Sequence, residues 1–363
     1  MRVLSAGECA APAFKRTWDF YFKPFRPGRS WKWAASAYVG QIGLFFLPLP
    51  LPILLAAVSH VHLRPAMWAL LSLASVAFIA FGFWIFYLCT RMEIVFFEAV
   101  LTKAPLVRPI WRRYGPQTWQ MVGARLVLSA VLGVFITMPM MRYILSMVHM
   151  FRNMPKPGMQ PDPMAQAALF RGIFSSEMML FAGLGIVMLL SSLLSDFMLP
   201  TLALEGETLG EAISRMLRLF RTEPLTMLAY VVLKALFGLL GFIVQYICNI
   251  VIVLFSLIPM GIIALIVGGL SWLALHSLGP VWHIVLILEM IAGYGLFVVW
   301  DLYLAIGTMG IVLTFLQYFA LFFLGGRYPK LGELLEPPPP PVYVAPPIET
   351  LPPPELPPMI EPV

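Results

Sequence analysis

Charged residues are scarce in this chain. Lys, Arg, Asp and Glu make up 12% of its 363 residues, whereas 60% of the residues are hydrophobic. A soluble globular protein carries a surface rich in charged side chains, so this composition excludes that class. The net charge of +6 lies mostly near the ends of apolar segments, where it favours contact with anionic lipid head groups. We therefore expect the lipid bilayer as a partner and no nucleic acid.

Cysteine and the familiar catalytic motifs are also missing or rare. Cys9, Cys89 and Cys248 are far apart and odd in number, so they predict neither a disulfide framework nor a metal site. His60 and His62 supply two imidazoles, which is fewer than a zinc site requires. The chain has no nucleophile elbow, phosphate-binding glycine loop, His-Glu-x-x-His motif or paired-carboxylate signature. We expect no catalytic residue, metal or cofactor, and hence no enzyme.

Long apolar stretches are abundant instead. Residues 66–84 carry no charge, and a helix needs roughly 20 such residues to cross a bilayer. A lone strand in lipid leaves its backbone groups unsatisfied, so each stretch is expected to be a helix. The sequence predicts an all-α fold, a polytopic helical membrane bundle of six to eight spans with cytoplasmic interfacial helices. The candidate spans are 34–58, 66–90, 120–148, 173–203, 226–256, 259–276, 282–304 and 308–326.

Three parts follow from this pattern: an interfacial N-terminal segment at 1–32, a membrane domain at 33–326 and a tail at 327–363. Residues 337–363 contain 13 prolines, which predicts a disordered, polyproline-II-like tail. The tail either docks on a protein partner or is simply solvated. The first 30 residues lack the features of a cleaved secretory signal, so we expect the N-terminus to be retained.

Aromatic and basic residues alternate over 14–32, a composition typical of the head-group layer. An ordinary flank of the first span is the alternative. Further on, Pro48, Pro50 and Pro52 interrupt that span. They predict either a broken helix, which can mark a transport site, or a helix that ends near the outer surface.

Orientation follows from the distribution of basic residues, which favours the cytoplasmic side. Placing the N-terminus inside puts 18 of the 24 Lys and Arg residues on that side. The sequence therefore predicts a multi-pass protein of a prokaryotic inner membrane with both termini in the cytoplasm.

Two charged segments separate spans on that side. In 204–223, Thr208 and Glu211 have the spacing of a capping box, and an amphipathic helix is expected to follow. Residues 91–103 occupy the equivalent place after the second span. This order is consistent with an internal repeat of 66–148 and 173–256. A chance likeness is the alternative, because the amino-acid sequences of the two segments match poorly.

Three stretches carry a family resemblance: 86–100, 196–212 and 318–329. They resemble uncharacterised prokaryotic multispan membrane proteins that look related to the membrane domain found beside glycerophosphoryl diester phosphodiesterases. The resemblance implies an architecture and no catalytic residues. The phosphodiesterase domain itself is not expected, because no His-Arg-Gly occurs and no soluble stretch could hold a barrel of about 250 residues.

Ionisable residues inside spans are functional candidates because a charge in hydrocarbon needs a partner or water. Lys234 and Glu289 lie at similar depths in two spans and are predicted to form either a structural ion pair or part of an ion path. Two further candidate pairs lie near span ends, Arg142 with Asp301 and Arg91 with Asp196.

The leading hypothesis is a non-enzymatic membrane scaffold, assembly or lipid-associated accessory subunit. The alternative is a transporter of small solutes or lipids, and a membrane-bound lipid enzyme comes third.

Overall fold

The computed structural model describes residues 2–23, 26–42, 65–103, 107–152, 163–275 and 279–336. Every regular element in these ranges is helical, which confirms the all-α prediction. The elements are η1 (Gly7–Cys9), α1 (Ala10–Phe22), α2 (Pro27–Ile42), α4 (Pro65–Thr102), α5 (Val107–Arg113), α6 (Gly115–Arg152), α7 (Pro163–Pro200), the π-helical turn η3 (Thr201–Glu205), α8 (Leu209–Thr222), α9 (Pro224–Leu275), α10 (Pro280–Gly325) and α11 (Pro329–Leu335).

Proline begins six of these helices. At the first helical position a backbone N–H has no acceptor within the helix, so the missing N–H of proline costs nothing there. The fixed φ angle of proline is also compatible with a helix. Gly279, just before α10, has φ 60°, which a residue with a Cβ adopts only with strain. The long helices α4, α7, α9 and α10 thus begin at prolines, whereas α6 begins at Gly115.

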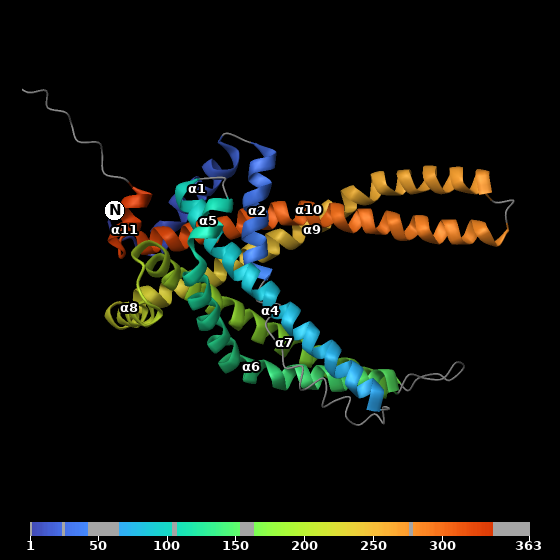
Figure 1. The fold of residues 1–363 in the computed structure, drawn as a ribbon, viewed down its shortest axis with the longest axis horizontal. Coiled ribbons are helices and arrows are strands. Elements are labelled where there is room, and N and C mark those ends of the chain that lie inside the picture. The colour runs from blue at the N-terminus through green and yellow to red at the C-terminus, as the bar shows by residue number, and fades with distance from the viewer. Residues whose placement is uncertain are drawn as a thin grey trace, which may run out of the picture.

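The long helices form two arms that diverge from a common junction (Figure 1). α9 and α10 run side by side as one arm, and α4, α6 and α7 form the other. α2 packs against both α4 and α10, so it bridges the two arms. The short helices α1, α5, α8 and α11 gather around the junction (Figure 1).

The apolar core lies at the junction. Phe97 of α4, Phe197 of α7, Tyr230 of α9 and Phe323 of α10 are all buried there. The arms, in contrast, expose large apolar side chains along their length, such as Leu265, which is 78% exposed. An apolar surface of this extent marks a region that water does not cover in the native environment.

Four of the described helices are long and apolar enough to cross a membrane, and they lie at Met67–Thr102, Phe170–Glu205, Pro224–Ala274 and Trp282–Gly325. The prediction of six to eight spans is therefore confirmed only as several membrane-length helices.

The separate spans predicted at 226–256 and 259–276 are a single helix, because Pro259 lies inside α9 without ending it. The break predicted between the spans 282–304 and 308–326 is also absent, because residues 304–308 lie within the continuous helix α10. The missing N–H of one proline interrupts a single backbone bond, whereas packing along the arm continues on both sides.

The separate elbow predicted at 91–103 is not formed. Residues 91–102 continue α4, and most of them are buried in the junction. The elbow that follows α4 is α5, whereas the elbow predicted at 204–223 is present as η3 and α8. The tail predicted as disordered at 327–363 is helical near its start, because Pro329–Leu335 form α11 and pack on the junction. Pro48, Pro50 and Pro52, His60 and His62, and residues 337–363 lie outside the described residues.

Candidate functional site

The first part of the candidate site is an ion pair between the two arms. Lys234 on α9 forms a salt bridge with Asp196, which lies near the end of α7. The two side chains are only 4% and 3% exposed. Tyr230, one helical turn before Lys234, donates a 2.7 Å hydrogen bond to the same carboxylate oxygen. Asp196 thus accepts two bonds from one face of α9.

A second buried ion pair lies within the other arm. Arg125 of α6 forms a salt bridge with Glu93 of α4, and these side chains are 2% and 6% exposed. The Arg125 guanidinium also donates a 2.8 Å hydrogen bond to the hydroxyl of Ser195 on α7. Its other terminal nitrogen lies 3.5 Å from the hydroxyl of Thr90.

The two ion pairs meet on α7, because Ser195 and Asp196 are consecutive. Together Glu93, Arg125, Ser195, Asp196 and Lys234 form what we call the buried charge cluster. It joins α4, α6, α7 and α9, and therefore connects both arms at their base. Each charge in it has an opposite charge as partner, which is the condition for holding charged groups away from water.

The predicted pair of Lys234 with Glu289 is wrong. Lys234 pairs with Asp196, and Glu289 accepts a hydrogen bond from Ser271 near the far end of α9. α9 and α10 are antiparallel, and Phe237 contacts Phe319. Lys234 is thus about 33 residues, or roughly 50 Å, from the level of Glu289. The prediction was wrong because α9 and α10 are each one continuous helix rather than two spans.

The other predicted pairs are not formed among the described residues either. Arg91 donates to the hydroxyl of Tyr87 at 2.6 Å and lies 4.5 Å from the ring centroid of Trp111, so Asp196 is not its partner. Arg142 is exposed on α6. Asp301 lies on α10, and one of its carboxylate oxygens is buried without a hydrogen-bond partner.

Glu93 and Arg125 were missed because sequence reasoning assigned both to the cytoplasmic ends of spans. A signal was present: Thr90 and Glu93 are three residues apart and share a helix face, as do Ser191 and Ser195 at a spacing of four. Polar residues repeated on one face of an apolar helix indicate a polar contact with a neighbouring helix.

The capping box predicted at the start of α8 is present. The backbone N–H of Thr208 donates to the Glu211 carboxylate at 2.8 Å, and the Thr208 hydroxyl lies 2.9 Å from the same oxygen. These hydrogen bonds hold the pKa of Glu211 below its ordinary value. The box therefore fixes the point at which the chain turns from η3 into the amphipathic helix.

Replacing Thr208 with Ala should loosen the first turn of α8, because it removes the side-chain half of the cap, worth about 0.5–2 kcal/mol. Hydrogen exchange of 208–213 should show lower protection factors than in the parent. A lowered carboxylate pKa stabilises the fold above the unfolded value of about 4.3 and ceases to do so as the pH falls. Protection of this turn should thus also decline below about pH 4. Thr222→Ala, at the other end of α8, is the matched control, and equal exchange in all three proteins would exclude the cap.

Residues 4–334 match a family of unknown function, DUF7544. The chain belongs to this family. No curated protein and no solved structure matches it. The match covers all of the described helices except the last residue of α11, so both arms and the buried charge cluster are parts of the DUF7544 unit. The family supports the prediction of an uncharacterised protein and assigns no activity to it.

Proposed function

We propose that this DUF7544 protein is a non-enzymatic integral membrane scaffold, a lipid-associated accessory subunit of a prokaryotic inner membrane. The observation that carries the proposal is the buried charge cluster. Its charges are paired with one another at the base of the arms, where they hold four helices together. Charges used in this way stabilise an architecture, whereas a transport path requires groups that water or a solute can reach. The proposal includes the predicted resemblance to the membrane domain found beside glycerophosphoryl diester phosphodiesterases. That resemblance implies an architecture and no catalytic activity.

The positions of the short helices support a cytoplasmic junction. α5 follows α4, and α8 follows α7, and both return the chain to the same junction as α1 and α11 (Figure 1). If α2 and α6 join the four membrane-length helices as spans, the chain crosses six times. An even number of crossings leaves both termini on one side, and the basic residues of α5 and α8 select the cytoplasm.

Accessibility to a thiol reagent tests this orientation. Ser214→Cys, on the exposed side of α8, should resist a membrane-impermeant maleimide in intact cells and react after permeabilisation, whereas Ser59→Cys should react in intact cells. Native Cys9 is a silent background, because its burial raises the pKa of the thiol to about 11 and only the thiolate reacts. Cys248→Ala removes the partly exposed cysteine. Labelling of position 214 in intact cells would reverse the proposed topology.

The surface that supports lipid association is an exposed aromatic stripe on α1. Phe14, Trp18 and Phe22 recur every four residues and are 63%, 51% and 36% exposed. The opposite face of the helix is buried against the junction. Lys15 and Lys23 flank this aromatic stripe. A helix with such a stripe and basic neighbours is suited to the interface between head groups and acyl chains, which supports the bilayer as partner for 1–32.

Transport by the arms is the competing function, and one observation favours it. Glu289 and Asp301 lie on the apolar α10, and each has a carboxylate oxygen without a hydrogen-bond partner. Such groups can carry protons through a membrane. Proton flux into proteoliposomes therefore separates the two functions. The scaffold predicts no flux above empty vesicles and the same low value for Glu289→Gln and Asp301→Asn. A flux that the parent supports and either variant removes would contradict the scaffold.

A further inference from the structure

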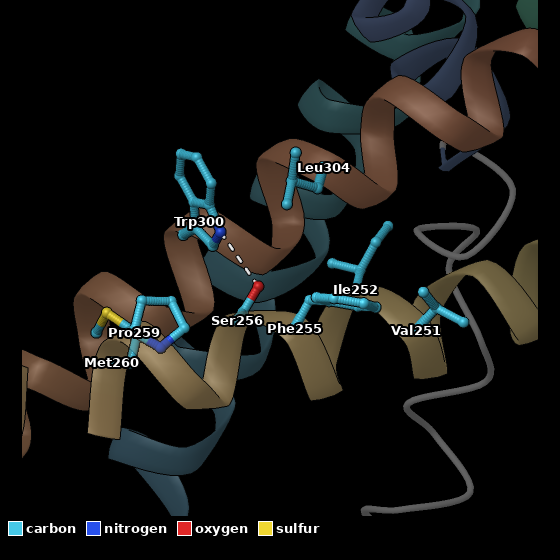
Figure 2. Close-up of a pocket in the computed structure, with 8 residues that line it drawn as sticks. All are labelled: Val251, Ile252, Phe255, Ser256, Pro259, Met260, Trp300 and Leu304. Carbon is cyan, nitrogen blue, oxygen red and sulfur yellow. Dashed lines mark hydrogen bonds between the residues drawn. The ribbon is translucent and has the colours of Figure 1, made fainter. Parts of the chain in front are cut away.

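Two cavities lie end to end along one face of α10. The first, of about 420 Å³, lies between α9 and α10 and contains Pro259 and Trp300 in its wall (Figure 2). The second, of about 250 Å³, lies between α10 and the pair α1 and α2. Leu304 lines both. The α10 residues that line them are Trp300, Tyr303, Leu304, Gly307, Thr308 and Ile311, a single helical stripe.

Both cavities are mainly apolar, and one buried donor distinguishes them. The cavity near Pro259 is lined by apolar side chains, and its Ser256 hydroxyl accepts a 3.2 Å hydrogen bond from the Trp300 indole (Figure 2). The cavity at the other end includes Ser30, Thr308 and Trp31. The indole N–H of Trp31 is buried without a hydrogen-bond partner, so a donor remains for an acceptor on a ligand. Both cavities thus suit a hydrocarbon chain, and the Trp31 N–H offers one polar contact at the end near α1 and α2.

Exposed cations lie close in sequence to the lining residues Ser30 and Trp31. They are Arg26 and Lys32. The lining residues of α10 extend over 11 positions from Trp300 to Ile311, or roughly 16 Å at 1.5 Å per residue. One leaflet of the hydrocarbon core is about 15 Å thick, half of the whole. The two cavities together therefore have about the length of one leaflet, and the end near α1 and α2 is the one that is close in sequence to the exposed cations.

We propose that this stripe is a binding site for one anionic phospholipid, with its acyl chain along α10 toward Pro259 and its head group at the elbow between α1 and α2. The site rests on the proposed membrane location of the arms. The stacked rings of Trp31 and Tyr303, 5.3 Å apart, form the wall where chain and head group meet. The head-group oxygens accept from the Trp31 N–H, and the cations of the elbow select negative charge.

Glycine substitutions give a clean test. A Cβ at Gly307 meets no atom within 4 Å, so Gly307→Leu should fill the stripe without displacing the backbone. Gly295 on the same helix is equally open but lines neither cavity, which makes Gly295→Leu the matched control. Arg26→Gln with Lys32→Gln tests the selection for charge.

The full chain would be reconstituted in nanodiscs that contain phosphatidylglycerol and phosphatidylcholine with diazirine-labelled acyl chains. Crosslinks should concentrate at 251–260 and 300–311 and favour phosphatidylglycerol. Gly307→Leu should lower them about tenfold, equivalent to 1.4 kcal/mol, while Gly295→Leu leaves them unchanged. The double Gln variant should abolish only the preference for the anionic lipid.

Crosslinks spread evenly along the arm, or an equal loss in both leucine variants, would overturn the lipid site and leave the membrane scaffold intact. A protein that alkaline carbonate extracts from native membranes would instead overturn the scaffold itself, so the two failures are distinguishable.

Discussion

Neutralising either Asp196 or Lys234 should destabilise the protein more than any other single charge change on α7 or α9. Asp196→Asn leaves the Lys234 ammonium without its counter-charge, and Lys234→Met leaves the carboxylate with only the Tyr230 hydroxyl. Breaking a buried ion pair by removing one partner costs ~3–5 kcal/mol. Equilibrium unfolding in mixed micelles, followed by circular dichroism, should report this loss for both single variants.

The double variant Asp196→Leu with Lys234→Met should recover most of that stability, since no buried charge then lacks a partner and apolar groups of similar volume can fill the site. Glu289→Gln is the matched control, because Glu289 also lies on an apolar helix but its partner is a neutral hydroxyl. We expect it to change stability by less than about 1 kcal/mol. Single variants as stable as the parent would show that the ion pair does not hold the arms together.

The sequence predicted the helix content and the long apolar helices well because both depend on local composition. The apolar length of 224–275 and the Thr208 capping box need no distant contact to be recognised. The breaks in α9 and α10 were predicted incorrectly because a proline or a dip in hydropathy signals a helix end only when packing does not continue past it. Whether Pro259 ends a helix depends on its neighbour, α10, which a single sequence does not reveal.

The pairing within the buried charge cluster could not be predicted from the sequence for the same reason. Lys234 and Asp196 were each recognised as costly charges, but their mutual pairing depends on how α7 and α9 cross at the junction. Depth along a helix restricts partners only when the ends of the spans are known. Arg125 was missed because basic residues near a span end usually lie at the head groups, whereas here the Arg125 side chain is buried in protein.

Gly310 of α10 is the position where the bridge formed by α2 should be most sensitive to a single methyl group. A Cβ at Gly310 would overlap the backbone of Ala34 on α2. Ala34 is 1% exposed and Ala37, one turn later, is 3% exposed, so small residues let the two helices approach closely. Overpacking such a contact costs ~1–3 kcal/mol or more, because a backbone must move rather than a flexible side chain.

Gly310→Ala should therefore lower the melting temperature in detergent and separate α2 from α10, whereas Gly307→Ala should not. Both positions lie on α10 within one turn, and both substitutions raise helix propensity equally. A Cβ at Gly307 meets open space, so only the contact with α2 distinguishes them. If Gly310→Ala were as stable as Gly307→Ala, α2 would not be packed tightly on α10, and the two arms would rely on the buried charge cluster alone.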